Sequence, residues 1–334
     1  MDNKIIQAMN IADKIIGDLL AVKAGEEVLI AIDTESDMRM AQAFAAASQK
    51  CGADFMIAMM AARDKSQATT IPKSLEEAMS GCDVFIPMTK ASGAPAYNLK
   101  MKALLREKKI RECCMVLRDI DNYIHGGALA DYEQVYVDGQ NLQKLWWHKK
   151  NAHVTSPAGT DLTFEMIDMM PIIECGIARE PGLSMAFSDG EVSLGPVEGT
   201  MNGTMVIDGP MCYYGLPSTP VRLRIENGRV AEILGGDPKI CKELEKLFAE
   251  VKNSDNIAEI GIGLNPASLF NGDFEEEKKA RGTIHFALGN GLYYDQSVDS
   301  QVHIDMVLYN TTVDFDGEIF VKDGNVIILD KIER

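Results

Sequence analysis

The chain has 334 residues, of which 46% are hydrophobic and 25% charged, and its formal net charge at pH 7 is −17. This length and apolar content are enough for two domains with sizeable cores. Because nucleic acids and anionic membranes are themselves negatively charged, the acidic balance argues against both as partners. No stretch has the length of apolar sequence that a membrane span needs.

The seven cysteines follow no spaced pattern. An odd number without a C-x-x-C pair is typical of reduced thiols in the cytoplasm, rather than of disulfides or structural zinc. Residues 1–20 predict an amphipathic helix and lack the basic start and continuous apolar core of a signal peptide. We therefore expect a cytoplasmic protein.

Residues 1–130 are expected to form an α/β domain, because short apolar runs alternate with helical patterns. Buried strands are predicted at 26–32 and 53–60, with a helix between them that has Ser36 as its N-cap and Gly52 as its stop. Such alternation predicts a parallel sheet with helices on both faces. The segment contains neither G-x-G-x-x-G nor a P-loop motif, so it gives no sign of nucleotide binding.

Residues 131–150 are predicted to form a linking helix, after which the sequence pattern changes. From 151 to 334 the chain runs through short strands separated by glycine and proline. Two dipeptides, Asn227-Gly228 and Asp323-Gly324, are strong signals for hairpin turns. The predicted fold is therefore α/β, with an N-terminal parallel-sheet domain and a C-terminal β-rich α+β domain.

Two residues in the last third of the chain, His303 and Asp305, lie two positions apart in the apolar run VHIDMVLY. Alternate residues of a strand point to the same face, so this pair presents an imidazole and a carboxylate to a common point. Glu259 and His285 lie in similar short apolar runs and could approach that point from neighbouring strands. Burying such groups without partners is costly, and a shared metal ion is the usual remedy.

The alternative interpretation gives these four residues separate structural roles. A lone histidine in a strand is often a hydrogen-bonded core or edge residue, and a lone glutamate often faces solvent. Spacing alone leaves both interpretations open.

Five short motifs occur in order from about residue 150 to the end of the chain. They are SPAGTDLT from Ser156, GEVSLGP from Gly190, AEI from Ala258, HFALG from His285 and VHID from Val302. Together they resemble the aminopeptidase T (leucyl aminopeptidase) family of metallopeptidases, which also includes the 2,5-dihydroxypyridine 5,6-dioxygenases. Each motif is short, so their order carries the resemblance.

In the peptidases of this family, matching residues hold a pair of divalent metal ions. The resemblance therefore implies five metal ligands, which are Glu191, Glu259, His285, His303 and Asp305. A set of three carboxylates and two imidazoles suits Zn, Mn or Co. The resemblance also implies a homodimer and a hydrolase that attacks a peptide or amide bond of a small substrate with metal-activated water.

The chain departs from the peptidase pattern at two places. The peptidases carry two adjacent glutamates where this chain has Gly190 and Glu191, which leaves Glu191 as the candidate catalytic carboxylate. They also have a tyrosine seven positions after the residue matching His285, where this chain has Leu292. A bulge of one residue would bring Tyr293 to that place, so Tyr293 is a second candidate catalytic residue.

The dioxygenase branch offers an alternative function. Its enzymes use two histidines and one carboxylate around Fe(II), which leaves positions open for O2 and substrate. His303 and Asp305 match two of these ligands, whereas the upstream histidine corresponds to Glu259, and His285 could in principle supply the second imidazole.

Because a carboxylate-rich set favours hydrolysis, the main prediction is a metal-dependent hydrolase resembling aminopeptidase T. A ring-cleaving Fe(II) dioxygenase and another metal-dependent enzyme acting on a small molecule are the alternatives. A non-enzymatic binding protein, with or without metal, is a further alternative, and it predicts ligand groups with no open position for water.

Overall fold

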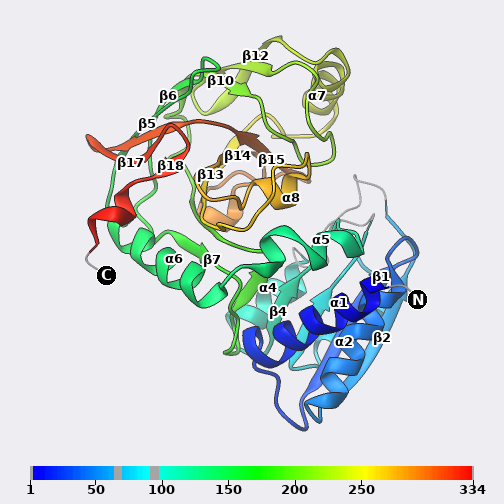
Figure 1. Cartoon of the computed structure of the whole chain (residues 1–334). Coiled ribbons are helices and arrows are strands. Elements are labelled where there is room, and N and C mark those ends of the chain that lie inside the picture. The colour runs from blue at the N-terminus through cyan, green and yellow to red at the C-terminus, as the bar shows by residue number, and fades with distance from the viewer. Residues whose placement is uncertain (1–2, 64–69, 91–97, 333–334) are drawn as a thin grey trace. The chain divides into compact units, whose positions relative to one another are not determined.

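The computed structural model describes residues 3–63, 70–90 and 98–332. The chain divides into two compact units, Met1–Glu133 with Glu174–Asp189 and Gln134–Ile173 with Gly190–Arg334 (Figure 1). The chain thus returns to the first unit at 174–189, a segment that the sequence placed in the second domain. Helix α6 (Tyr132–Trp146), expected as a linker, belongs to the second unit from Gln134 onward.

The first unit is built on a five-stranded parallel sheet, which confirms the expected α/β architecture. In sheet order the strands are β2 (Asp54–Met60), β1 (Glu27–Asp33), β3 (Val84–Pro87), β4 (Arg111–Cys114) and β8 (Ser184–Ala186). Strand β3 is buried throughout and β1 is buried after its first residue, as is typical of parallel strands covered on both faces.

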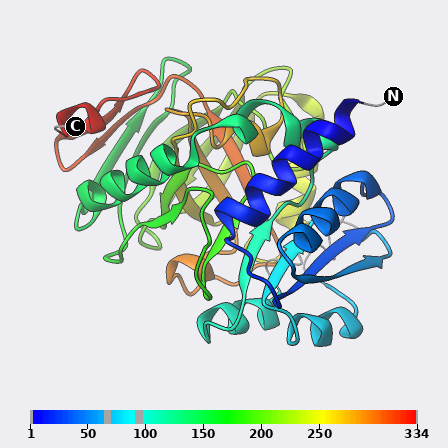
Figure 2. The ribbon, with the colours of Figure 1, turned by 60° about the horizontal axis from the view of Figure 1, so that its bottom comes forward.

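Helices cover both faces of this sheet (Figure 2). Among the described residues, the helical elements of the first unit are α1 (Asn3–Asp13), the π-helical turn η1 (Lys14–Leu19), α2 (Met38–Lys50), α3 (Lys73–Met79), α4 (Leu99–Arg106), α5 (Ile120–Ile124) and the 3-10 turn η4 (Gly126–Leu129). On one face, Leu75 of α3 and Met101 of α4 share an apolar core with Phe85 of β3. Helices α1 and α2 lie on the opposite face.

The start of α2 differs from the prediction by one residue. Asp37, not Ser36, is the N-cap, and its side chain accepts a hydrogen bond from the Arg39 amide. The Ser36 hydroxyl instead lies 2.9 Å from both Asp33 Oδ1 and the Met88 carbonyl oxygen. Ser36 therefore links the end of β1 to the chain that follows β3, and this long-range role is invisible in the local sequence.

The second unit contains an eight-stranded antiparallel sheet. In sheet order its strands are β12 (Arg229–Gly235), β11 (Val221–Glu226), β10 (Asn202–Ile207), β6 (Asp161–Glu165), β5 (Asn151–Thr155), β16 (Thr312–Phe315), β17 (Glu318–Lys322) and β18 (Asn325–Val326). Both predicted hairpin turns are confirmed, because Asn227 and Gly228 have φ of 51° and 73°, and Asp323 and Gly324 have φ of 47° and 76°. Two consecutive left-handed residues are what a type I′ turn requires.

A second sheet of five strands completes this unit. In sheet order its strands are β15 (His303–Leu308), β14 (Ile284–Gly289), β13 (Ile257–Gly263), β9 (Glu191–Leu194) and β7 (Ile172–Glu174). In Figure 1 the eight-stranded sheet curves around β13, β14 and β15. Phe164 of β6 and Phe286 of β14 meet edge to face with ring centroids 6.0 Å apart, so the two sheets share a core.

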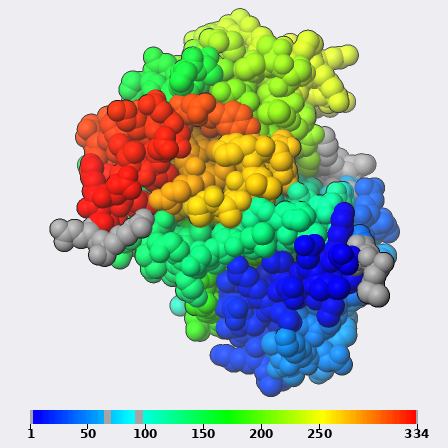
Figure 3. Space-filling model, in the orientation of Figure 1, coloured from blue at the N-terminus to red at the C-terminus, as the bar shows by residue number. Residues whose placement is uncertain are grey.

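The remaining helical elements of the second unit are α7 (Pro238–Glu250), α8 (Phe274–Glu277) and the 3-10 turns η5 (Leu292–Tyr294) and η6 (Ile328–Lys331). Leu269 and Phe270, in the loop before α8, are 48% and 65% exposed. Figure 3 shows this gold-coloured part of the chain on the surface of the second unit. Across residues 3–63, 70–90 and 98–332, no helix is long and apolar enough to cross a membrane.

Candidate metal centre

The register of three antiparallel strands places the predicted ligands on one face of the five-stranded sheet. Ala287 of β14 lies opposite both Glu259 of β13 and Asp305 of β15. Directly opposite residues of an antiparallel pair share a face, and so do alternate residues along a strand. His285 and His303 therefore join Glu259 and Asp305 on that face.

The positions between these ligands on the same face carry small side chains. They are Gly261 and Gly263 of β13, Ala287 and Gly289 of β14, and Ser193 of β9. A Cβ atom at residue 261 would stand 2.1 Å from Cε1 and 2.3 Å from Nε2 of His285. The small residues therefore provide the space into which the imidazoles and carboxylates fold.

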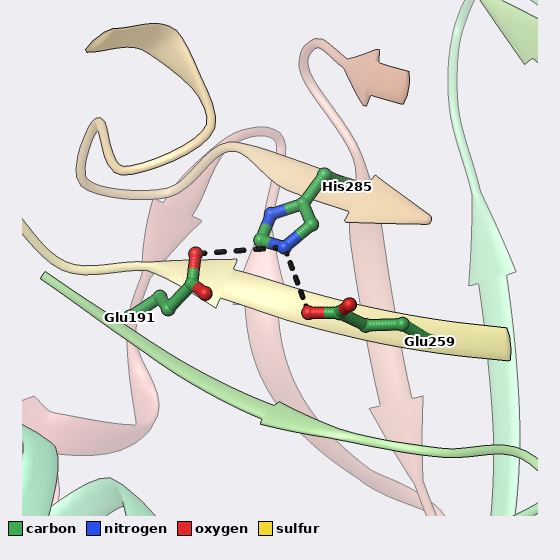
Figure 4. A group of neighbouring side chains, drawn as sticks. All are labelled: Glu191, Glu259 and His285. Carbon is green, nitrogen blue, oxygen red and sulfur yellow. Dashed lines mark hydrogen bonds and ion pairs between the residues drawn. The ribbon is translucent and has the colours of Figure 1, made fainter. Parts of the chain in front are cut away.

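Two groups of candidate ligands share Glu259. We call Glu191, Glu259 and His285 the inner group (Figure 4), and Glu259, His303 and Asp305 the outer group. Within each group the ligand atoms lie within 4.8 Å of one another. The structure thus brings together all five residues that the sequence singled out as metal ligands.

Glu259 joins the groups through its two carboxylate oxygens. Its Oε1 lies 3.2 Å from His285 Nε2, and its Oε2 lies 2.9 Å from His303 Nε2. On the far sides, His285 Nε2 lies 3.5 Å from Glu191 Oε2, and His303 Nε2 lies 3.2 Å from Asp305 Oδ1. Each imidazole is therefore held between two carboxylates.

Two consecutive lysines close the ends of this arrangement. Lys279 Nζ lies 2.9 Å from Glu191 Oε1, and Lys278 Nζ lies 2.7 Å from Asp305 Oδ2. Glu191 and Asp305 thus each turn one oxygen to a lysine and the other to a histidine. The result is a buried chain of groups in which basic and acidic residues alternate: Lys279, Glu191, His285, Glu259, His303, Asp305 and Lys278.

The sequence did not reveal the lysines. Their charged run, 275–279, has the balance of a solvated loop or helix start, yet Glu276, Glu277, Lys278 and Lys279 are all buried. Nothing in a short run of mixed charge separates a solvated segment from one whose charges are paired inside the protein. The pairing partners lie on β9 and β15, far away in the chain.

The two groups differ in access to solvent. The side chains of the inner group are almost fully enclosed, with His285 at 0% and Glu191 at 2% exposure. The His303 side chain of the outer group is 24% exposed. The outer group is therefore exposed to solvent at the His303 side chain, whereas the inner group is shielded.

The carboxylates and imidazoles of the centre shift one another's pKa values toward the charged forms. Burial alone would raise the pKa of Glu259, but hydrogen bonds with His285 and His303 hold it well below its usual range. Burial would lower the pKa of both imidazoles, but the charges and hydrogen bonds of the facing carboxylates raise it, and for His303 well above its usual value. Without metal, the facing carboxylates therefore favour the protonated form of both imidazoles.

The outer group has the donor atoms that a divalent cation needs. Glu259 Oε2, His303 Nε2 and Asp305 Oδ1 face one another, and a cation between them would replace the proton of the imidazole. Carboxylate oxygen and imidazole nitrogen together suit Fe(II), Mn(II), Co(II) and Zn(II). The residues present therefore fit a divalent metal ion.

The backbone at Gly190 explains why this chain lacks the first of the two adjacent glutamates of the peptidases. Gly190 has φ of 139°, and a Cβ atom there would lie 2.9 Å from Asn265 Cβ and 3.0 Å from the Asn265 backbone nitrogen. The Gly190 carbonyl also accepts a hydrogen bond of 2.8 Å from the Leu264 amide. The backbone at residue 190 therefore has no room for a second carboxylate.

Tyr293, the second candidate catalytic residue, belongs to neither ligand group. Its side chain is 41% exposed and packs edge to face against Tyr294, with ring centroids 5.1 Å apart. The hydroxyl of Tyr294 lies 2.9 Å from Ser193 Oγ, on the strand that carries Glu191. The catalytic roles of Tyr293 and Glu191 stay predictions.

A cavity of about 540 Å³ lies beside α8. Its lining includes Leu216, Phe270, Asn271, Glu277, Arg281 and Tyr309. Glu277 directly precedes Lys278, the lysine paired with Asp305. The connection between α8 and β14 thus contributes both to the outer group's surroundings and to a cavity large enough for a small molecule.

The chain forms two units, and the second carries two groups of side chains that could hold a divalent metal ion. A family model described as 2,5-dihydroxypyridine 5,6-dioxygenase matches residues 17–328, and the chain therefore belongs to this family. A 2,5-dihydroxypyridine 5,6-dioxygenase from Pseudomonas putida KT2440 is 25% identical over 191 residues, which are 53% of this chain and 54% of the relative. The chain therefore spans about half the length of the curated relative it matches.

Two solved structures share the fold. A 2,5-dihydroxypyridine dioxygenase from Pseudomonas putida KT2440 has a TM-score of 0.81 at 19% identity, covering 96% of this chain and 97% of that one. Wild-type AmpT from Thermus thermophilus has a TM-score of 0.67 at 16% identity, covering 96% and 99%. The predicted resemblance to a family that contains both kinds of protein is confirmed.

The main functional prediction from the sequence was wrong. It named a hydrolase of the metallopeptidase or aminopeptidase type, whereas the family model and the curated relative are dioxygenases. The error came from weighing the number of carboxylates, since the sequence could not show that Glu191 and Asp305 are each paired with a lysine.

Proposed function

We propose that this protein is a metal-dependent dioxygenase that opens the ring of a hydroxylated N-heteroaromatic compound such as 2,5-dihydroxypyridine. The observation that carries the proposal is the outer group, Glu259, His303 and Asp305, which has the donors for a metal ion and is reached by solvent at His303. Membership of the dioxygenase family supports the choice of reaction.

The charges favour one metal ion over two. Four carboxylates, counting Glu275 at 3.8 Å from Lys278, against two lysines leave two negative charges when both imidazoles are neutral. One divalent ion neutralises these two charges, as two protonated imidazoles do without metal. A second ion would add two further positive charges in a buried site, which is unfavourable in a medium of low dielectric.

We propose Fe(II) as the native ion, held by Glu259, His303 and Asp305. The chemistry that Fe(II) supplies when bound is to hold O2 and a ring hydroxyl side by side and to pass electrons between them. The protein's own side chains orient the ligands. Lys278 fixes Asp305 through Oδ2 and leaves Oδ1 directed at His303.

The inner group serves as the support of this site. Glu191 pairs with Lys279 and contacts His285. His285 in turn contacts Glu259 Oε1, the carboxylate oxygen that faces away from His303. Such outer contacts fix the orientation of a ligand and raise its affinity for the metal. The enclosure of the inner group keeps water from competing for these contacts.

The proposal is tested with protein purified without oxygen. We expect close to one iron per chain by elemental mass spectrometry, and consumption of O2 and 2,5-dihydroxypyridine in equal amounts. His303→Ala should remove both iron and activity. His153→Ala is the matched control, because His153 is also a histidine in a strand paired with a carboxylate, Asp161, but it lies on the eight-stranded sheet.

Two results would contradict the proposal. Iron-loaded wild type that consumes no O2 with any hydroxylated pyridine would exclude the reaction. Two tightly held ions per chain would exclude the mononuclear site.

A further inference from the structure

Lys279 is a fully buried lysine beside the inner group. Its side chain is 0% exposed, and its Nζ lies 2.9 Å from Oε1 of Glu191, whose side chain is 2% exposed. Lysine is almost never fully buried unless it is paired, because removing an ammonium group from water is costly. The ion pair therefore places a positive charge directly on one carboxylate of the inner group.

Two consecutive backbone amides hold this lysine and this glutamate in place. The Leu264 amide donates to the Gly190 carbonyl oxygen at 2.8 Å, one residue before Glu191. The Asn265 amide donates to the Lys279 carbonyl oxygen at 2.8 Å. One dipeptide therefore fixes the backbone on both sides of the ion pair, and the fold itself positions the ammonium group.

The inner group would otherwise have the donors for a second metal ion. Glu191, Glu259 and His285 each offer one ligand atom, and these atoms lie within 4.8 Å of one another (Figure 4). An ion held there would share the Glu191 carboxylate with the ammonium group of Lys279. In an enclosed site little water screens charges, so the ion and the ammonium group would repel each other strongly.

The negative charge of the inner group is already balanced when an ion occupies the outer group. Glu259 belongs to both groups, so an ion at the outer group takes up its charge. Glu191 is then the remaining carboxylate of the inner group, and Lys279 neutralises it. A second ion would therefore add positive charge to a buried site that has none to balance, which is unfavourable.

The adjacent lysine lies at the other end of the centre. Lys278 Nζ is 2.7 Å from Asp305 Oδ2, in the outer group, and 3.8 Å from Glu275 Oε2. The chain therefore has two consecutive lysines that pair with carboxylates of different groups. Their effects on the number of bound ions can be compared directly.

We propose that Lys279 limits the metal centre to one ion, because its fixed ammonium group supplies to Glu191 the positive charge that a second ion would bring. Lys279 acts through Glu191 and supplies no ligand atom, so it is a positioning residue. The assignment of the single ion to the outer group rests on the proposed function.

The test counts the Co(II) ions bound per chain in wild type and in Lys279→Met. Methionine keeps much of the lysine chain but removes its charge. Equilibrium dialysis against excess Co(II), with elemental mass spectrometry, should give about one ion in wild type and about two in Lys279→Met. The two ions would share Glu259, so magnetic coupling between them should reduce the EPR signal per Co(II) ion.

Three further variants separate the charge on Glu191 from other effects. Lys278→Met removes the same charge from the outer end and should bind one ion. Lys279→Met combined with Glu191→Gln should also bind one ion, because an amide is a weaker ligand than a carboxylate. Lys279→Gln, which can hydrogen-bond to Glu191 without a positive charge, should bind two ions and decides the outcome where Lys279→Met does not fold.

The outcomes distinguish this proposal from the proposed function. One ion in Lys279→Met or Lys279→Gln would overturn the role of Lys279, although wild type could still consume O2. Two ions in Lys278→Met would overturn it too, because total charge would then set the number. Two ions in wild type would overturn this proposal and the mononuclear site together. Wild type that binds one ion but consumes no O2 would remove the proposed function alone.

Discussion

The imidazole of His285 lies against the backbone of Gly261, its partner across the β13–β14 pair. A methyl group at residue 261 would overlap the ring, with Cε1 only 2.1 Å away. The glycine is therefore part of the metal centre, although it supplies no ligand atom.

Gly261→Ala should displace His285 and disturb Glu259. We expect a loss of about 1–3 kcal/mol in the free energy of unfolding, which is usual for overpacking a buried site, and weaker metal binding. Urea unfolding and a metal titration measure the two effects. Gly17→Ala is the control, because a Cβ at residue 17 meets no atom within 4 Å; it should leave metal binding unchanged and should not lower the free energy of unfolding, since alanine is favoured over glycine in a helix.

Part of the candidate ligand set could be predicted from the sequence for a simple reason. His303 and Asp305 are two apart in one strand, so their shared face follows from the period of the strand alone. The convergence of Glu259 and His285 on the same point depends on the pairing of β13, β14 and β15, which their short apolar runs left open and the family resemblance favoured. The expected homodimer stays a prediction.

The sequence could not show which carboxylates are already paired with a lysine. Whether Glu191 and Asp305 are available to a second metal ion depends on Lys279 and Lys278, which reach them across the fold. Function was therefore misjudged through contacts that have no local signature.

Metal affinity should increase with pH through the neutral range. The facing carboxylates raise the pKa of His285 and of His303, so in the metal-free protein both imidazoles keep their protons above the pH at which a free histidine loses them. A metal ion held by Glu259, His303 and Asp305 must displace the proton of His303, and its affinity therefore falls as pH falls. Titration calorimetry with Co(II) in two buffers should show release of up to about one proton per ion. An affinity that is constant from pH 6 to pH 8 would show that His303 is already neutral.

Placing a glutamate at residue 190 should not create a peptidase. The left-handed backbone at Gly190 and its contact with Asn265 leave no space for a side chain, so Gly190→Glu must distort the start of β9. We expect a lower midpoint of thermal unfolding and no cleavage of short peptides. Gly199→Glu is the matched control, because residue 199 also has positive φ, at 79°, but a Cβ there meets no atom within 4 Å. Equal destabilisation in the two variants would show that the backbone angle, and not the contact with Asn265, limits residue 190.

Removing the ammonium group of Lys279 should destabilise the metal-free protein more than removing any exposed partner of a carboxylate. Lys279 and Glu191 are enclosed, with side-chain exposures of 0% and 2%, so Lys279→Met leaves a carboxylate without its neutralising charge. The expected loss is about 3–5 kcal/mol in the free energy of unfolding. Lys50→Met is the control, since the Lys50–Asp13 pair is exposed at 70% and 41% and water screens its charges, so its loss should change stability little. The double variant Lys279→Met with Glu191→Gln should recover most of the loss, because it removes the buried charge as well. If the double variant is no more stable than Lys279→Met, packing of the lysine chain rather than its charge holds Glu191 in place.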